Sequence, residues 1–371
     1  MVPKITGIIN RFSSKIAYVL KSFETGSQQS KSSYEQKETF SYRLCNIRRH
    51  LIDQGFSKSV TNIISNSWRQ STNTQYEYCW RLWLLWCSPK QINSVEPTVK
   101  QFLQYLSTLY YKGKSYSCIN SHKSAICQTL VLLGNSIFVD NLLISRFMKG
   151  IFNLRPPLCR YLFTWNVGSV LKFLSTLFPL KNLPLKLVTL KCVALIALAT
   201  AQRSQTIATL DLDLMFFDKD SVNFKIGSLI KTSRPKHTDK NVIIHCYDRE
   251  NICPVRTLNH YIATTKTLRK STKVFISFKT YKKVTSSTIA RWLKDVLKKS
   301  GINTSRFKAH SYRGAAATAA FNAGMTLNDV LKTADWSSAQ TFYKFYHKEV
   351  EKSTILQTNN GNFTESVLNS I

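Results

Sequence analysis

The sequence predicts a mainly α-helical protein with a small antiparallel β-sheet, in which a helical domain precedes a mixed α+β domain. Apolar residues recur at helical spacing through most of the chain, and they alternate as in strands only between residues 212 and 245. The chain has 371 residues, which is enough for two domains because a domain averages about 150 residues. Two adjacent prolines in residues 153–158 disfavour a helix and place the boundary there.

The chain is strongly basic, with 52 Lys and Arg against 20 Asp and Glu and a formal net charge of +32. Apolar residues still make up 43% of the sequence, so the chain can bury a core. A surface this positive attracts polyanions, and nucleic acid is the commonest of them. Ribosome association and binding to a membrane surface are the alternative explanations of the charge.

The sequence favours an intracellular protein. Apolar pieces in the first twenty residues are interrupted by Lys4, Arg11 and Lys15, which argues against a secretory signal. The longest apolar run, residues 187–199, contains Lys191 and is shorter than the ~18 residues that a membrane span needs. The nine cysteines form no Cys-x-x-Cys pair, which predicts reduced thiols. We therefore expect no membrane association, no metal site and no cofactor.

The N-terminal part divides into an arm and a helical domain. Residues 1–50 are basic and polar, and we expect a flexible arm. Residues 57–150 have helical periodicity, and the first helix carries Trp80, Trp83 and Trp86 three residues apart. Such a stripe is more typical of a packed core than of a base-stacking surface.

Two more helices complete this domain. Pro97 suits the first turn of one helix, and the other is capped near Ser115 and stopped by Gly134. A basic cluster surrounds the start of the second helix, where backbone N–H groups also favour phosphate. We predict that this cluster binds DNA phosphates, with a solvated charged face as the alternative; its members are Lys112, Lys114, His122 and Lys123.

The second domain opens with a helix, residues 187–200, that is apolar on all sides and should be buried. Arg203 follows it directly, and a charge in that position must be paired or must serve a site. Alternating apolar residues then predict strands at 212–216, 222–226 and 242–245. Lys231 lies at a turn of this sheet.

The C-terminal part begins with a strongly amphipathic helix that Thr285 caps and Gly301 ends. His310 and Arg313 come next, one helical turn apart and therefore on the same face. Trp336 and a tyrosine-rich segment follow, and the polar tail after residue 351 is expected to trail away or to dock on another subunit.

These residues occur in the order found in the tyrosine recombinase (phage integrase) family, which the chain resembles over residues 159–350. The shared features are Arg203 after a buried helix, Lys231 in a sheet turn, and His310-x-x-Arg313 at a helix start, followed by Trp336 and a tyrosine. The local sequence is most similar to the integrases of DIRS-like and Crypton mobile elements, notably in residues 201–206, 231–235 and 336–346. The resemblance implies that residues 57–150 are a core-binding, DNA-binding domain and residues 159–350 a catalytic domain.

The resemblance assigns a role to each residue. Arg203 and Arg313 would grip the non-bridging oxygens of the scissile phosphate, because guanidinium forks bind them bidentately without a metal. The tyrosine would attack phosphorus to form a phosphotyrosine. His310 would accept and return its proton, and Lys231 would protonate the leaving 5′ oxygen.

Two tyrosines compete for the role of nucleophile. Tyr346 ends the segment Thr-Phe-x-x-Phe-Tyr and is our choice, while Tyr343 lies one turn earlier and is expected to pack. The spacing from Trp336 to Tyr346 is one residue longer than the commonest family spacing. Thr206 stands where many members carry an acidic residue that orients the first arginine, which predicts an active centre that is held differently or less well here.

The sequence thus predicts a site-specific recombinase or integrase of a mobile element, which breaks and rejoins double-stranded DNA as a homodimer or homotetramer on paired sites. Additional DNA contacts are predicted for Arg234 and Lys236, beside Lys231. In a eukaryotic host we expect it in the nucleus. The alternatives are a catalytically silent DNA-binding protein of the same fold and a type IB topoisomerase-like enzyme.

Overall fold

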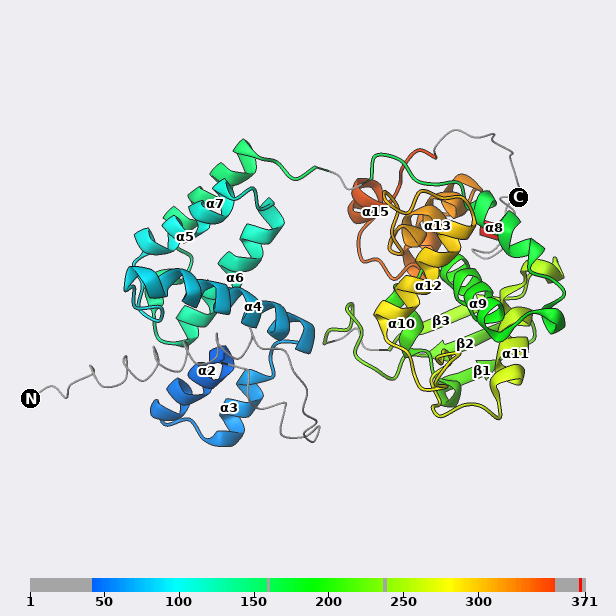
Figure 1. The fold of residues 1–371 in the computed structure, drawn as a ribbon, viewed down its shortest axis with the longest axis horizontal. Coiled ribbons are helices and arrows are strands. Elements are labelled where there is room, and N and C mark those ends of the chain that lie inside the picture. Colours follow the sequence, from blue (N-terminus) through cyan, green and yellow to red (C-terminus); the bar gives the residue numbers. More distant parts are fainter. Residues whose placement is uncertain (1–41, 159–160, 236–238, 351–366, 369–371) are drawn as a thin grey trace, which may run out of the picture. The chain divides into compact units, whose positions relative to one another are not determined.

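The computed structural model describes residues 42–158, 161–235, 239–350 and 367–368. It divides into two compact units, residues 1–158 and residues 159–371 (Figure 1). The expected arm lies outside the described residues up to position 41. Beyond it the expectation was wrong, because residues 42–50 belong to a helix that buries Ile47 and Leu51.

The first unit is entirely helical in its described part. Its elements are α2 (Tyr42–Asp53), α3 (Lys58–Ser65), α4 (Gln70–Cys87), η2 (Ser88–Lys90), α5 (Val99–Tyr111), α6 (Tyr116–Leu132), η3 (Ser136–Phe138) and α7 (Leu142–Leu154). Ser115 caps α6 and Gly134 follows its end with φ +88°, as predicted. Pro97 lies outside α5, which instead begins with a capping box made by Thr98 and Gln101.

The tryptophans of α4 form the core of this unit. Trp80 and Trp83 are fully buried, and the Trp83 ring meets Phe102 and Tyr105 edge-on at 6.1 Å and 5.1 Å between centroids. Its indole N–H donates to the Ser94 carbonyl at 2.9 Å. The prediction that this stripe packs inside is confirmed.

The second unit is built around helix α9, which is buried from Val188 to Thr200. Helices α10, α11, α12 and α13 and strand β3 all pack against α9. The helices are α8 (Val167–Thr176), η4 (Leu180–Asn182), α9 (Leu185–Thr200), α10 (Ser204–Thr209), η5 (Leu212–Leu214), η6 (Glu250–Ile252), α11 (Pro254–Thr265), α12 (Ser286–Lys299), α13 (Ser311–Asn322), α14 (Leu327–Thr333) and α15 (Ala339–Phe345). None of the helices in the described ranges is long and apolar enough to span a membrane.

The sheet of this unit is antiparallel in the order β1-β2-β3, formed by β1 (Met215–Phe217), β2 (Ser221–Lys225) and β3 (Asn241–His245). Val222 and Phe224 point into the core, and Phe224 lies opposite Val242. The first predicted strand is shorter than expected, because Leu212–Leu214 form a 3-10 turn. The loop between β2 and β3 carries Lys231.

Two segments close the second unit. Thr164 forms a parallel bridge with Val350, and its amide donates to the Glu349 carbonyl at 2.9 Å. Val367 and Leu368 are fully buried in the core of the same unit. The chain just before α8 and the chain just after Tyr346 are therefore joined.

Candidate active site

The first site residue is positioned by the end of α9. Ala201 ends this helix in the left-handed conformation with φ +48°, a strained state for a residue with a side chain. The turn reverses the chain direction, so that Arg203 becomes the N-cap of α10 and is partly exposed. The carbonyl of Ala201 is thereby left to accept a bond from outside the helix.

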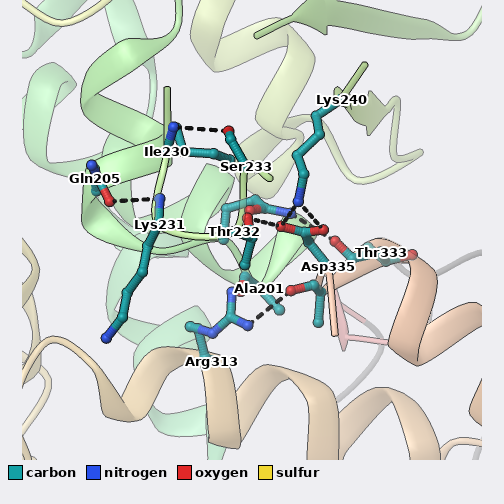
Figure 2. Close-up of polar contacts among 12 residues, drawn as sticks. Ala201, Gln205, Ile230, Lys231, Thr232, Ser233, Lys240, Arg313, Thr333 and Asp335 are labelled. Carbon is teal, nitrogen blue, oxygen red and sulfur yellow. Dashed lines mark hydrogen bonds and ion pairs between the residues drawn. The ribbon is translucent and has the colours of Figure 1, made fainter. Parts of the chain in front are cut away.

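Arg313, in the first turn of α13, donates this hydrogen bond. Its side chain is buried, with 1% of the residue exposed. Nη1 donates to the Ala201 carbonyl and Nη2 to the Ala334 carbonyl, both at 2.8 Å (Figure 2). Nε is buried and has no hydrogen-bond partner among the described residues. The guanidinium therefore joins two distant segments and keeps donors that these bonds do not use.

The charges around Arg313 favour an anion. Burial lowers the pKa of Arg313, and the positive charge of Arg203 lowers this pKa further. The neighbouring Tyr346 hydroxyl and the Asp335 carboxylate act in the opposite direction. An arginine stays charged in a protein, so two cations are held close together. A phosphate between them would relieve their repulsion.

Tyr346 has its hydroxyl at this cluster. The hydroxyl lies 3.1 Å from Nε2 of His310, the N-cap residue of α13, a distance suited to proton transfer. The Tyr346 ring stacks on Trp336 with centroids 4.3 Å apart and an angle of 28°. A Cβ at Gly314 would lie 3.6 Å from the Tyr346 ring, an ordinary van der Waals distance, so Tyr346 packs directly over this position of α13.

Tyr343 lies elsewhere. It is 47% exposed, and its ring meets Phe321 edge-on at 6.2 Å. Its other ring contacts are with Phe342 and His347. Of the two candidate tyrosines, Tyr346 is the one that the fold brings to the histidine and the buried arginine.

Lys231 lies on a turn of the β2–β3 loop. Its backbone amide donates to Oε1 of Gln205 in α10 at 3.2 Å, which anchors the turn two residues from Arg203 (Figure 2). The side chain is exposed. Its ammonium forms no hydrogen bond within the described part of the chain, so it is available to a ligand.

Comparison with known proteins bears on this arrangement. Residues 175–352 match the model of the phage integrase family. This part of the chain is therefore similar to that family. It contains Arg203, Lys231, His310, Arg313, Trp336 and Tyr346. The comparison with curated proteins found no match.

Solved structures of integrases and recombinases share the fold. XerH site-specific recombinase bound to difH substrate in a pre-cleavage complex is 14% identical, with 82% of this chain and 93% of that chain covered and a TM-score of 0.54. A lambda integrase tetramer bound to a Holliday junction is 11% identical, with 93% of this chain and 89% of that chain covered and a TM-score of 0.53. The Tn1549 transposon integrase in complex with circular intermediate DNA is 12% identical, with 84% of this chain and 96% of that chain covered and a TM-score of 0.53. The predicted fold class is confirmed.

The structure contradicts one of the predicted DNA contacts. His122 is 3% exposed and its Nδ1 lies 2.8 Å from the Tyr105 hydroxyl. Its ring is part of the core, and its predicted contact with phosphate was wrong. Lys236 lies outside the described residues. The other candidates are exposed or partly exposed: Lys112, Lys114, Lys123 and Arg234.

Sequence reasoning missed three residues next to the candidate site. The Asp335 carboxylate accepts from Thr232 Oγ1 at 2.5 Å and from the Lys240 ammonium at 2.5 Å and 2.6 Å (Figure 2). Lys240 is 8% exposed, so this ion pair is largely buried. The partners are 95 residues apart in sequence, and no local pattern links them. The only signal was an aspartate beside Trp336 in a very basic chain.

Proposed function

We propose that this protein is a site-specific DNA recombinase that breaks and rejoins DNA through a 3′-phosphotyrosine intermediate, with Tyr346 as the nucleophile. One observation carries the proposal. The Tyr346 hydroxyl lies 3.1 Å from His310 Nε2 and beside the buried Arg313, which already has Arg203 as a neighbour. A nucleophile and a base therefore lie beside a buried arginine whose pKa a second arginine lowers.

The proposed reaction is an exchange of phosphoester bonds. Arg203 and Arg313 hold the non-bridging oxygens, and the Tyr346 oxygen attacks phosphorus. The phenol proton passes to His310, the P–O5′ bond breaks, and Lys231 protonates the leaving oxygen. Religation is the reverse: a 5′ hydroxyl of another strand attacks the phosphotyrosine and releases Tyr346. The Trp336 ring holds the tyrosine by stacking.

Double-stranded DNA is the proposed partner, bound by homodimers or homotetramers on paired sites. The solved XerH and lambda integrase structures are DNA complexes, and one of them is a tetramer on a Holliday junction. The net charge of +32 supports a polyanionic partner. The basic residues proposed to contact DNA are Lys112, Lys114, Lys123 and Arg234.

A mobile element, close to the DIRS-like and Crypton group, is the proposed origin of the chain. This proposal is supported by the local sequence of residues 201–206, 231–235 and 336–346. In a eukaryotic host such an enzyme would act in the nucleus.

Covalent trapping tests the proposed function. The full chain is incubated with a pool of nicked duplexes of random sequence, in which the short cleaved fragment diffuses away and prevents religation. We expect DNA that remains attached to the protein in SDS, and a nucleotide-bearing peptide that contains Tyr346. Sequencing the attached DNA would reveal the preferred site.

The matched variants are Tyr346→Phe and Tyr343→Phe. We expect the first to lose the adduct and the second to keep it within about threefold, because only Tyr346 lies at His310 and Arg313. DNA binding without an adduct from wild type would instead support the catalytically silent alternative. Relaxation of supercoiled plasmids that lack the recovered site would support topoisomerase-like activity.

A further inference from the structure

We propose that Asp335 is a positioning residue, which fixes the turn that carries Lys231 against the Arg313, Trp336 and Tyr346 cluster. The inference rests on the proposed function, because it assigns to Asp335 an effect on the step in which Lys231 acts.

The Asp335 carboxylate contacts two residues of the loop that carries Lys231. Thr232 follows Lys231 directly, and Lys240 stands at the other end of the loop, where its carbonyl accepts from the Ile226 amide at 2.9 Å. Both side chains donate to the Asp335 carboxylate. Gln205 holds the Lys231 amide from α10. The turn is therefore fixed at three points, two of them on one carboxylate (Figure 2).

The backbone of Asp335 shows why an aspartate at this position is informative. Its amide donates to the Lys332 carbonyl at 3.2 Å, and the Trp336 amide donates to the Leu331 carbonyl at 2.9 Å. These two bonds form a Schellman motif at the end of α14, with Asp335 at φ +54°. Glycine is the residue most favoured at this point of the motif. An aspartate in this conformation is more strained than a glycine would be, which supports a specific role for its carboxylate.

The same turn also reaches the rest of the site. Ala334 immediately precedes Asp335, and its carbonyl accepts from Arg313 Nη2 at 2.8 Å. Trp336 immediately follows, and its ring stacks on Tyr346. Three consecutive residues thus contact the buried arginine, the Lys231 turn and the tyrosine. A shift of Asp335 would change the distance between the proposed acid and the proposed nucleophile.

Substrates with oxygen or sulfur at the bridging 5′ position test this link. The site recovered from wild-type adducts is synthesised in both forms, and cleavage is measured in single turnovers at saturating protein. A thiolate leaves without protonation, so a defect in the leaving-group acid disappears with sulfur. We expect Lys231→Ala and Asp335→Gly to slow cleavage of the oxygen substrate by about 10- to 100-fold. On sulfur, both should cleave within about threefold of wild type.

Asp335→Gly suits this test because glycine is favoured at φ +54°, so the side chain with its carboxylate is removed without straining the backbone. Asp239→Asn, at an exposed aspartate of the same loop, removes one negative charge and should leave both rates unchanged. Asp335→Gly with Lys240→Met removes both ends of the ion pair. We expect this double variant to cleave the oxygen substrate slowly. It has no unpaired buried ammonium, but the Lys231 turn still lacks its contacts with Asp335.

Three results would overturn the inference while wild type still forms the Tyr346 adduct. They are an unchanged rate for Asp335→Gly on oxygen, an equal loss on oxygen and sulfur, and full recovery in the double variant. Failure of Lys231→Ala to recover on sulfur would remove the acid that Asp335 is proposed to position. Absence of any adduct from wild type would instead refute the proposed function.

Discussion

Arg43 in the first unit and Arg313 in the second are both buried, yet their surroundings differ in one respect. Each guanidinium lies over an aromatic ring, 4.5 Å from the Trp68 centroid for Arg43 and 4.8 Å from the Trp336 centroid for Arg313. Each has a buried Nε with no hydrogen-bond partner among the described residues. Burial lowers the pKa of both.

The difference is the charge next to each arginine. Glu77 lies near Arg43, whose Nη2 also donates to Asn73 Oδ1 at 2.8 Å. The charge that lies near Arg313 and acts most strongly on its pKa, after burial, is that of another arginine, Arg203. Burial and ring contacts therefore do not distinguish a structural arginine from a ligand-binding one. The charges beside the two arginines differ: a carboxylate raises the pKa of Arg43, while Arg203 lowers that of Arg313, and a bound anion would relieve this repulsion.

The largest expected effect comes from replacing Arg313 with lysine. Lysine keeps the charge and loses the planar fork that bonds Ala201, Ala334 and a phosphate. We expect Arg313→Lys to slow adduct formation by at least about 100-fold, or about 3 kcal/mol. Rates at saturating protein measure it, and Arg249→Lys at an exposed position is the control. A loss below threefold would show that Arg313 is structural, like Arg43.

Lys191 is a further buried cation and sharpens the comparison. Its ammonium donates to the Leu177 and Asn251 carbonyls at 2.6 Å, and burial lowers its pKa to about 8. A lowered pKa means that the unfolded chain binds more protons between about pH 8 and pH 10.5. This contribution to stability therefore rises with pH across that window.

The pH effect appears as a difference between wild type and Lys191→Met. Relative to the variant, wild type should gain about 2.5 kcal/mol in free energy of unfolding between pH 7 and pH 10. Taking the difference cancels the buried cysteines and tyrosines, whose raised pKa values act in the opposite direction. Urea unfolding at the two pH values measures it, and a constant difference would contradict the buried state of this ammonium.

The smallest effect is expected for Arg43→Met, which tests the structural half of the comparison. It leaves the Asn73 and Thr129 acceptors without their donor and should cost about 2 kcal/mol of stability. The rate of adduct formation at saturating protein should not change. Arg49→Met, at an exposed position of the same helix, is the control. A loss of cleavage without a loss of stability would show that Arg43, like Arg313, acts in the reaction and is not a structural residue.

The fold was readable from the sequence wherever periodicity and caps were strong. The buried helix α9, the three strands and the Ser115 and Gly134 boundaries all followed from local patterns. Helix α2 was missed because half of its twelve residues are polar or charged and it follows a polar segment of the sequence. Its burial depends on Arg43 and on partners in α4 and α6, which no local pattern reveals.

The candidate site was predictable as a set of residue types but not as a network. The order of Arg203, Lys231, His310 and Arg313 pointed to one site, and the fold brings His310, Arg313 and Tyr346 together. The ion pair of Asp335 with Lys240 could not be predicted, because its partners come from separate elements. His122 was misjudged, since a histidine beside lysines looks the same in sequence whether it points outward or inward.

The bridge between Thr164 and Val350 has a consequence for how subunits could share work. The chain on one side of Tyr346 is bonded to its own unit through Glu349, and the Tyr346 carbonyl accepts from Thr318 at 2.9 Å. A tyrosine tethered at its own α13 would act on DNA held by its own arginines. Mixing Tyr346→Phe chains with Arg313→Lys chains should then give no complementation, because no single protomer would contain a complete centre.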